Sequence, residues 1–423
     1  MNYFNYRKGE LYCENIPIKE IVKTVGTPLY VYSYRTFERH FKVFDKAFQK
    51  IPHIVCYSCK ANANGSLLRI INKLGGGADI VSGGELYKVL RAGIPNNKIV
   101  FSGVGKTEEE LRAAIRAGIL MINIESEGEL AMLKKLSKSM KRKVPVSIRV
   151  NPEIDPKTHP YITTGLKKNK FGVLWNDAHR LYHEIAKEKY LIPAGMSSHI
   201  GSQILELTPF MDAVKSLKSM VRELRGNGIS LTMMDIGGGL GITYKDELPP
   251  LPEEYAKVVE KELKGMGLKL ILEPGRVLVG NSGIFVTKVL YVKKVPEKTF
   301  YVVDGAMNDL VRPSLYNAYH EIKPVKEKKG ATIKADLVGP ICESGDFFAK
   351  DREIPTLIQD DLLAIFGAGA YGYSMSSNYN ARRRAPEVLV KDREFFIVKK
   401  RETLADLVKG ESTPPFLEVY SFD

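Results

Sequence analysis

Short apolar runs alternate with longer amphipathic runs between residues 53 and 275 of the chain. The short runs are rich in β-branched residues, which is typical of buried strands. They span residues 53–59, 78–82, 98–103, 119–124, 144–150, 194–200, 231–239 and 268–275. Strands that alternate with helices predict βα units around a parallel sheet. Eight such units predict an α/β fold with a (β/α)8 barrel of the TIM type.

The runs between the predicted strands have apolar positions three and four residues apart, as amphipathic helices do. They cover residues 64–75, 83–93, 106–118, 126–140, 177–188, 209–226 and 253–265. Several of them end in glycine, which is common where a helix stops. A further amphipathic run at 35–50 precedes the first strand, and we expect it to supply the eighth helix of the barrel.

The pattern changes after about residue 278. Six β-rich runs follow, separated by charged or Gly/Pro turns, at 283–295, 299–305, 332–340, 360–369, 386–392 and 393–400. They predict a second, all-β domain. The segments LYCENIPI and PLYVYSY near the start of the chain also have extended character. We therefore expect a β-domain built from both chain ends, residues 1–32 and 279–423, with the barrel at 33–278 between them.

The composition indicates a globular protein. The 423 residues are 44% hydrophobic and 26% charged, close to the average for folded soluble chains. No apolar run reaches the roughly 18 residues that span a bilayer, and the first residues lack the organisation of a signal peptide. Four cysteines are too few for a disulfide framework in so long a chain. We expect a cytoplasmic protein with reduced thiols and no membrane partner.

The formal net charge of +14 is compatible with a nucleic-acid or anionic-membrane partner. The lysines, however, are dispersed over helix ends and loops, with the densest cluster at 134–143, and dispersed lysines are typical of a solvated surface. An anionic small-molecule ligand accounts for the remaining basicity. We therefore predict no nucleic-acid partner.

Cys56 and Cys59 form a C-x-x-C pair in the first predicted strand. Positions three apart on a strand point to opposite faces, and no second pair of ligands follows at the spacing of a zinc site. We therefore predict no metal site.

Reactive side chains and glycines follow the predicted strands. In a (β/α)8 barrel the active site lies at the C-terminal ends of the strands, where the following loops converge. The residues found there are Lys60, Asp79, Arg149, Asn151, His199, Gly237, Gly238, Gly239, Glu273 and Arg276. Each has an ordinary structural explanation, but their joint placement on one rim predicts an active site.

Two of these motifs have alternative interpretations. Lys60 ends an apolar strand, where poor hydration favours the deprotonated amine and Schiff-base chemistry, or else it forms a rim ion pair. The glycines of DIGGGLG let backbone N–H groups approach an anion, as at the phosphate sites of barrels, or serve only a tight turn. The segment lacks the dinucleotide-binding fingerprint, because Ile242 occupies the place of its third glycine.

Glu273 in the segment EPGR is expected to face the barrel mouth. A carboxylate opposite a lysine and a phosphate site is what a pyridine ring requires, because it holds the ring nitrogen protonated. His199 is placed to stack on the other face of such a ring, although a lone histidine is more often structural. The rim therefore predicts a site for a pyridine coenzyme.

Together these motifs resemble a known family, the pyridoxal-phosphate decarboxylases that share a fold with alanine racemase. The resemblance extends from GTPLYVY near residue 26 to MSSNYNARRRAPEV, which ends at residue 388. It points to the subfamily that converts meso-2,6-diaminopimelate to L-lysine and CO2, the last step of lysine biosynthesis. It implies a carbon–carbon lyase that uses pyridoxal 5'-phosphate.

The resemblance also implies roles for the rim residues. Lys60 in YSCKAN binds the coenzyme covalently, although many relatives have a small or apolar residue at the position of Cys59. Asp79 and His199 pack about the coenzyme, and Glu273 meets its pyridine nitrogen. The remaining coenzyme contacts that the resemblance implies are Ser202, Gly237, Gly238, Gly239, Gly275, Arg276 and Tyr371.

For the substrate, the resemblance covers the segments MNDLVRPSLYNAYH and GPICESGD. It implies that Arg312 and Tyr316 hold a carboxylate and that Glu343 binds the distal ammonium, with Arg276 and Tyr371 as further substrate contacts. Cys342 is the expected proton donor. In relatives the CES segment reaches into the partner's site, which implies an obligate homodimer with shared active sites.

Three alternative functions fit part of the sequence. Decarboxylases for ornithine, arginine or carboxynorspermidine share the barrel, but the first two need no pair such as Arg312 and Glu343. An amino-acid racemase shares the coenzyme and needs a tyrosine base rather than the C-E-S-G-D element. A non-catalytic basic binding protein explains the charge alone and predicts salt-sensitive nucleic-acid binding.

Overall fold

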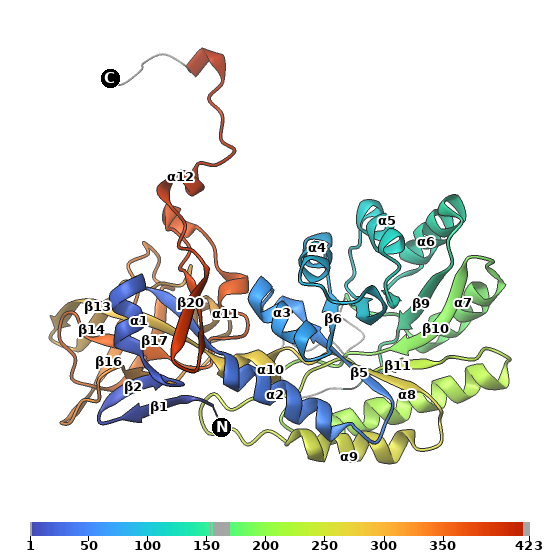
Figure 1. Cartoon of the computed structure of the whole chain (residues 1–423), viewed down its shortest axis with the longest axis horizontal. Helices are drawn as coiled ribbons and strands as arrows, with labels where there is room; N and C mark the ends of the chain where they lie inside the picture. Colours follow the sequence, from blue (N-terminus) through green and yellow to red (C-terminus); the bar gives the residue numbers. More distant parts are fainter. Residues whose placement is uncertain (1, 153, 155–169, 418–423) are drawn as a thin grey trace.

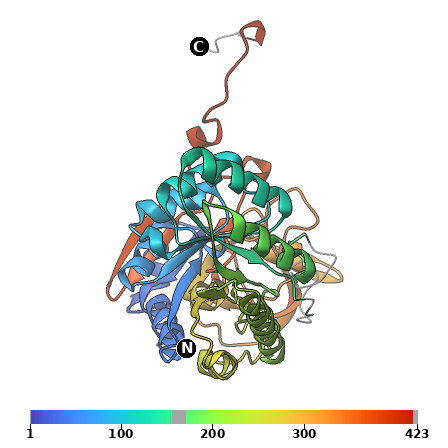
Figure 2. The same ribbon diagram turned by 90° about the vertical axis from the view of Figure 1, so that its right-hand side faces the viewer.

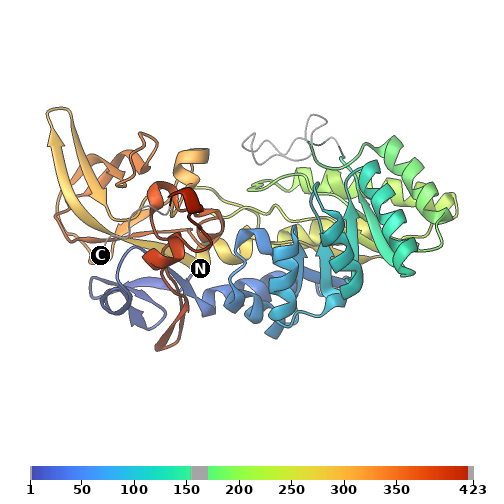
Figure 3. The same ribbon diagram turned by 90° about the horizontal axis from the view of Figure 1, so that it is seen from above.

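The computed structural model describes residues 2–152, 154 and 170–417. It has two parts, a barrel ringed by helices and a β-sheet domain, which lie end to end along the long axis (Figures 1 and 3). Both ends of the described chain belong to the side of the sheet domain, and its last segment, up to residue 417, projects away from it (Figure 1). None of the helices in the described ranges is long and apolar enough to cross a membrane.

Eight parallel strands form a closed barrel, which confirms the predicted fold class. The strands are β5 (His53–Ser58), β6 (Gly77–Ile80), β7 (Ile99–Phe101), β8 (Met121–Ile124), β9 (Val144–Arg149), β10 (Leu191–Ser197), β11 (Met233–Asp235) and β12 (Lys269–Leu272). Neighbours in sequence are neighbours in space, and β12 pairs with β5 to close the barrel.

The predicted strands differ from the observed ones mainly at their ends. The run predicted at 231–239 contains only the three-residue β11, because the glycines that follow turn into a rim loop. The run predicted at 194–200 begins three residues too late. The part of β10 that was not predicted contains the exposed Ile192 and the half-buried Pro193. It lies next to a register shift in the pairing with β9.

Helices surround the barrel as a ring (Figure 2). They are α2 (Tyr34–Ala47), α3 (Gly65–Lys73), α4 (Gly83–Arg91), α5 (Glu108–Ala117), α6 (Glu127–Met140), α7 (Trp175–Lys187), α8 (Thr208–Gly226) and α9 (Pro252–Leu263), with the short α10 (Arg276–Val279) after β12. The prediction that the segment before the first strand supplies a helix of the ring is confirmed by α2. The adjoining Phe48 meets Tyr255 of α9 edge to face at 5.5 Å.

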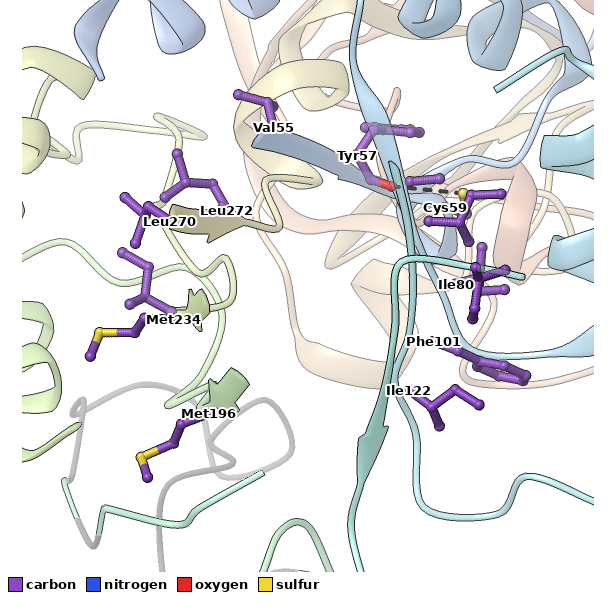
Figure 4. Packing of buried hydrophobic residues seen from close by; sticks show 14 of the residues in the cluster. Val55, Tyr57, Cys59, Ile80, Phe101, Ile122, Met196, Met234, Leu270 and Leu272 are labelled. Atoms are coloured by element: carbon purple, nitrogen blue, oxygen red, sulfur yellow. Dashed lines mark hydrogen bonds between the residues drawn. The ribbon is translucent and has the colours of Figure 1, made fainter. Parts of the chain in front are cut away.

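Alternation along the strands sorts side chains to the two sides of the barrel wall. Val55 and Tyr57 of β5 point outward and pack with the helices, in the cluster drawn in Figure 4. Ile54 and Cys56 belong to a separate interior cluster. Cys59, just after the strand, lies in the outer cluster, so the two thiols of the C-x-x-C pair lie on different sides of the wall.

The interior of the barrel changes from apolar to polar along the strands. Ile54, Val100, Met121 and Ile271 form part of the apolar layer. At the next inward position toward the C-terminal end, in or just after every strand, stands a buried polar residue. These residues are Ser58, Asp79, Ser102, Asn123, Ser147, Ser197, Asp235 and Glu273. The polar layer forms the floor of the barrel mouth.

The second part is built around one large antiparallel and parallel mixed sheet, as the sequence predicts for an all-β domain. Its strands are β4 (Leu29–Ser33), β13 (Gly283–Val295), β14 (Lys298–Val303), β15 (Ile322–Pro324), β16 (Thr332–Val338), β17 (Phe347–Pro355), β18 (Leu362–Ile365), β19 (Glu387–Lys391) and β20 (Glu394–Lys399). Strand β4, from the start of the chain, lies between β13 and β19, so both chain ends share this sheet.

The first residues only partly follow the prediction that they pair with the large sheet. Strands β1 (Phe4–Arg7), β2 (Glu10–Cys13) and β3 (Ile16–Pro17) form a separate three-stranded sheet, followed by α1 (Ile18–Val25). An isolated bridge from Glu10 to Lys326 joins this small sheet to the later chain, and the N–H of Leu11 donates to the carbonyl of Val325 at 2.8 Å. The small sheet also packs against the large one, because its apolar residues share a buried cluster with Val31, Ile284 and Val388.

Two strands and two α-helices after residue 279 were not predicted. Strand β17 carries the charged stretch Lys350 to Glu353, which has a loop-like sequence but is tolerated because β17 is an edge strand. Strand β15 is only three residues long. The short helix α11 (Arg312–Tyr316) begins around Pro313, which is favourable in a first helical turn, and α12 (Leu404–Leu407) lies near the chain end.

Phe41 tests the packing of α2 on the barrel. Its ring is 2% exposed and lies so close to Gly76 that a methyl group there would stand 2.8 Å from it. We expect Phe41→Ala to lower the free energy of unfolding by about 3–5 kcal/mol, because a large cavity opens. Chemical denaturation measures this. The neighbouring Lys42→Ala, at a side chain 62% exposed, serves as the control and should cost less than about 0.5 kcal/mol. Equal costs would contradict the packing described.

Candidate active site

A cavity opens at the C-terminal ends of the barrel strands, where the barrel meets the sheet domain. It has a volume of about 210 Å³ and continues into a narrower space beside the glycines that follow β11. The predicted site residues that line these two spaces are Lys60, His199, Ser202, Gly238, Gly239, Glu273, Gly275, Arg276, Arg312, Tyr316 and Tyr371. The structure therefore brings together most of the residues singled out from the sequence.

Lys60 lies at the edge of this cavity, one turn after β5. It belongs to the 3-10 helix η1 (Cys59–Ala61), and its side chain is 35% exposed. Its Nζ donates to Oδ2 of Asp79 at 2.6 Å, and Ser58 Oγ donates to the same oxygen at 2.7 Å. The other oxygen, Oδ1, is buried with no partner among the described residues. Asp79 is thus fully buried beneath the lysine rather than in the cavity wall.

The expectation that Lys60 loses its proton readily is wrong for this arrangement. Burial lowers the pKa of the Lys60 ammonium, but the carboxylates of Asp79 and Glu273 outweigh it, so that its pKa lies above the ordinary value. The apolar strand alone suggests desolvation. The two acids come from β6 and from the end of β12, so only the closed barrel places them beside the amine.

The loop after Lys60 is tied to the sheet domain by two asparagines. Asn62 donates to the carbonyl of Gly369 at 3.2 Å, and Asn64 donates to Oε2 of Glu387 at 2.8 Å. Glu387 is 1% exposed and also accepts from Tyr32 of β4 at 2.8 Å. Buried carboxylates need such partners. These bonds fix the position of the lysine relative to the second half of the cavity.

Glu273 belongs to a buried network of carboxyl groups. Ser102 donates to its Oε1 at 3.2 Å, and Asn123 donates both to Ser102 Oγ and to Oδ2 of Asp235, each at 3.0 Å. Burial, together with the charges of Asp235 and Asp79, raises the pKa of Glu273 well above its usual range. Burial also raises the pKa of Asp235 to about 6. Burial of the network therefore favours the protonated form of Glu273.

The glycines after β11 pack against other backbone. A Cβ on Gly238 would stand 2.2 Å from the carbonyl oxygen of Glu273, and one on Gly239 would stand 2.6 Å from that of Gly201. Gly237 has a φ of +67° and donates its N–H to Asp235 at 2.9 Å. Only Gly238 and Gly239 of the three line the cavity. Larger residues would push the loop away from the strand ends.

His199 follows β10 and lines both spaces of the cavity. The backbone N–H of Gly238 donates to its Nδ1 at 3.3 Å, which therefore carries no proton. Burial, and then the positive charges of Arg149 and Lys60, hold the pKa of His199 well below its ordinary value. Its ring is neutral and able to lie against an aromatic ligand.

Arg276 connects the cavity to its outer wall. Its Nη1 donates to the hydroxyl of Tyr244 at 2.7 Å, and its Nη2 donates to Ser202 Oγ at 3.0 Å. The guanidinium also stands 4.8 Å from the ring centre of Tyr371, a residue in the left-handed region with a φ of +56°. Burial raises the pKa of Tyr244, but the charges of Arg276 and Arg312 outweigh it and lower that pKa below its ordinary value.

Arg312, on α11 of the sheet domain, is 6% exposed and lines the same cavity. Its guanidinium lies over the ring of Tyr244 at 4.6 Å, and its Nη1 meets His320 at 2.9 Å. The Nε atoms of both Arg276 and Arg312 are buried and unpartnered within the described ranges. No Asp or Glu of those ranges forms an ion pair with either arginine. Two buried cations without acid partners constitute an anion site.

Cys342 and Glu343 do not line this cavity. Both are exposed, and the N–H of Cys342 donates to Asn380 at 2.9 Å. The loop is shaped by Asp346, the last residue of C-E-S-G-D, whose two oxygens accept from the N–H groups of Met307 and Ile341, each at 2.7 Å. The two predicted residues are therefore held on the surface of the same chain that provides Lys60.

Several contributors to the site were missed in the sequence. Arg149 was noted on the rim without a role. It binds Glu125 at 3.1 Å and stacks on Phe171 at 4.7 Å in the cavity wall. Asp235 and Asn123 were not noted at all. The alternation along the strands could have found them, because they occupy inward positions one step beyond the apolar layer. His320 and Tyr244 gave no comparable signal.

Comparisons with known proteins identify relatives of the whole chain. Residues 34–280 match the family described as "Pyridoxal-dependent decarboxylase, pyridoxal binding domain". The diaminopimelate decarboxylase of Pseudomonas aeruginosa is 46% identical over 415 residues, covering 98% of this chain and all of the relative. That of Aquifex aeolicus is 47% identical over 408 residues, covering 96% of this chain and 97% of the relative.

Solved structures give the same result. The diaminopimelate decarboxylase from M. jannaschii in complex with L-lysine superposes with a TM-score of 0.94 at 38% identity, covering 98% of each chain. The enzyme from Helicobacter pylori complexed with L-lysine has a TM-score of 0.90 at 41% identity, covering 93% of this chain and 98% of that one.

Asp79 should control the protonation of Lys60. We expect Asp79→Asn to lower the pKa of Lys60 by about one unit or more, because the nearest negative charge is lost. The pH dependence of Lys60 arylation by trinitrobenzenesulfonate in the coenzyme-free protein, followed by peptide mass spectrometry, should shift its midpoint to lower pH. Asp246→Asn, at a side chain 84% exposed, is the control. An unchanged or higher midpoint in Asp79→Asn would show that Asp79 does not set this pKa.

Proposed function

The chain belongs to the diaminopimelate decarboxylases within the pyridoxal-dependent decarboxylase family, and from this premise we propose that it converts meso-2,6-diaminopimelate to L-lysine and CO2. This reaction is the last step of lysine biosynthesis. The observation that carries the proposal is the pair of buried guanidiniums, Arg276 and Arg312, that have no acid partner in the described chain and line the same cavity as Lys60. A substrate with a second carboxylate supplies the missing negative charge.

The residues of the cavity fit pyridoxal 5'-phosphate. Lys60 would hold its aldehyde carbon, and Glu273, whose raised pKa lets it share a proton, would meet the ring nitrogen. Ser202, Arg276 and the glycine loop would hold the phosphate, since Arg276 retains a buried Nε without a partner among the residues described. When bound, the coenzyme supplies an electron sink for the carbanion that loss of CO2 leaves behind.

The other predicted coenzyme contacts also fit this coenzyme. His199 is neutral and lines both spaces of the cavity, so its ring suits a stacking contact with a pyridine. Gly237 shapes the loop, and Gly275 leaves room because a Cβ there would stand 3.0 Å from Ser58. Tyr371 shares the wall with Arg276, at the boundary between coenzyme and substrate.

Asp79 is the residue that receives the proton of Lys60. The amine must lose its proton before it can attack an aldehyde carbon. Asp79 Oδ2 stands 2.6 Å from Nζ, in hydrogen-bond contact, and no water has to enter between them. Because the pKa of the Lys60 ammonium is raised, transfer of its proton to Asp79 is unfavourable until the charge of the site changes. Ser58 steadies the acceptor oxygen throughout.

Substrate selection follows from the charges of the wall. Arg312, with Arg276 nearby, would bind the distal carboxylate in a planar, two-point contact, and Tyr316 would complete the pocket. Holding that end fixes which of the two amino-acid centres meets Lys60. Loss of CO2 from the D centre leaves the L centre intact, which gives L-lysine.

We assign the remaining two roles to a second copy of the chain. The distal ammonium needs an acid and the carbanion needs a proton donor, and Glu343 and Cys342 are suited to these tasks. Both are exposed and lie outside the cavity of their own chain. A homodimer in which each C-E-S-G-D loop enters the partner's cavity supplies both groups. The four cysteines are all free, which fits a reducing compartment such as the cytoplasm.

Release of CO2 from a panel of amino acids tests the proposed reaction. The panel is meso-diaminopimelate, ornithine, arginine, lysine and carboxynorspermidine. We expect kcat/KM for meso-diaminopimelate to exceed the others by about a hundredfold or more, because the others leave Arg312 without a carboxylate partner. Lys60→Ala is the inactive control and should also lose the coenzyme that borohydride fixes on the Lys60 peptide. A preference for ornithine would refute the proposed substrate.

Mixed dimers test the shared site. Lys60→Ala and Cys342→Ala should each be inactive alone, but co-expressed chains should recover about a quarter of wild-type activity, because half of the dimers are mixed and each has one intact site. The matched control combines Lys60→Ala with Arg312→Leu. These two residues line one cavity of one chain, so no intact site can form. Recovery in the control, or none in the first pair, would exclude the proposed sharing.

A further inference from the structure

His320 lies directly behind Arg312, outside the cavity wall. Its side chain is fully buried, with an exposed fraction of 0%. Its Nδ1 stands 2.7 Å from the carbonyl oxygen of Phe366, and its Nε2 stands 2.9 Å from Nη1 of Arg312. A carbonyl oxygen can only accept, so Nδ1 carries the proton and donates. Nε2 is then the acceptor for the guanidinium, and the ring as a whole is neutral.

The surroundings of His320 keep the ring neutral. Arg352 donates to its backbone carbonyl at 3.0 Å, and the Tyr244 ring meets its ring edge to face at 5.3 Å. Burial, then the charge of Arg312 and with it those of Arg276 and Arg352, lowers the pKa of His320 to about 3. A proton on Nε2 would also point at Arg312. The ring therefore serves as an acceptor over the whole range in which enzymes work.

A neutral acceptor behind Arg312 leaves the positive charge of the anion site unchanged. Buried arginines are usually paired with carboxylates, which fix their geometry and also cancel their charge. His320 fixes the position of one nitrogen of Arg312 without cancelling the positive charge of the guanidinium. The positive charge stays available to the cavity, which Arg312 and Arg276 both line. In the outer wall the two guanidiniums stand over the same Tyr244 ring, at 4.6 Å and 5.9 Å.

We infer that His320 is a positioning residue for substrate selection: it orients Arg312 as a neutral hydrogen-bond acceptor and so leaves the full charge of the arginine for the distal carboxylate of the substrate. This inference rests on the proposed function. It adds a determinant that touches neither coenzyme nor substrate and acts through Arg312 alone.

If His320 had a purely structural role, the effects of its substitution would be different. It would fill space behind α11 and hold the Phe366 carbonyl, and replacements of equal size would then behave alike. Gln and Glu provide such a pair. Both have the same shape and an oxygen that can accept from Arg312, but Glu adds a negative charge. Comparing the Gln and Glu variants therefore distinguishes the two interpretations, because the two side chains have the same volume and differ in charge.

The test uses the coenzyme-loaded enzyme and two ligands that differ by one carboxylate. L-Lysine keeps the carboxylate of the distal centre, and cadaverine lacks it. Calorimetry measures both dissociation constants for the wild type, His320→Gln and His320→Glu. We expect His320→Gln to bind L-lysine within about threefold of the wild type, and His320→Glu to bind it about tenfold or more weakly, because a buried ion pair now occupies Arg312. Cadaverine affinity should change by less than about threefold in both variants.

His320→Leu gives a second arm if His320→Glu does not fold. It removes the acceptor without adding charge, so L-lysine affinity should fall while cadaverine affinity is retained. Equal L-lysine affinities in the Gln and Glu variants, or parallel losses for both ligands in any variant, would overturn the inference. Wild-type turnover of meso-diaminopimelate, measured alongside, separates these outcomes from failure of the proposed function itself.

Discussion

The pairing of β12 with β5 is the constraint on which the site depends. These strands are far apart in sequence, and their register sets Leu270 opposite His53 and Leu272 opposite Val55. The residues that follow are thereby brought together at the rim. Ser58 Oγ lies 2.9 Å from the backbone carbonyl oxygen of Glu273, across 215 residues of chain. Without this closure, Lys60 and Glu273 would belong to unrelated loops, and neither the raised pKa of the amine nor that of the acid would arise.

Closure also gathers acids in the floor of the mouth. The acids Asp79, Asp235 and Glu273 all come from inward positions of the barrel strands and lie in the polar floor. Of the arginines without acid partners, Arg276 begins α10 just after Glu273, whereas Arg312 is carried by α11 of the sheet domain. Arg312 and the three acids are therefore attached to different parts of the fold. A zwitterionic substrate can lie between them, with its reacting amine near the acids and its far carboxylate near Arg312.

The sequence was sufficient for the barrel, the sheet domain and the residues that end the strands, because those features follow from local periodicity. Lys60, His199 and Glu273 were found from their positions after apolar runs. What the sequence did not reveal depends on distances between strands. The Asp235–Asn123–Ser102 chain of hydrogen bonds requires the stagger of three strands, and no single strand encodes it. The pKa of Lys60 was misjudged for the same reason, since the acid that governs it is supplied by β6. Strand β17 was missed because its charged residues are tolerated only at a sheet edge.

The composition of the cavity supports the proposal that a second copy of the chain completes the site. The Lys, Arg, Asp and Glu side chains that line the cavity within the described residues are Lys60, Arg149, Arg276 and Arg312, with Glu273 as the acid. Arg149 is already neutralised by Glu125, and Glu273 is assigned to the coenzyme. A substrate with two ammonium groups needs at least one more acid, placed at the far end from Lys60. The chain holds such an acid, Glu343, on an exposed loop whose shape is fixed by Asp346 rather than by the cavity. The charge deficit inside the cavity and the ordered, exposed C-E-S-G-D loop are therefore two aspects of one proposed arrangement, in which each copy of the chain completes the site of the other.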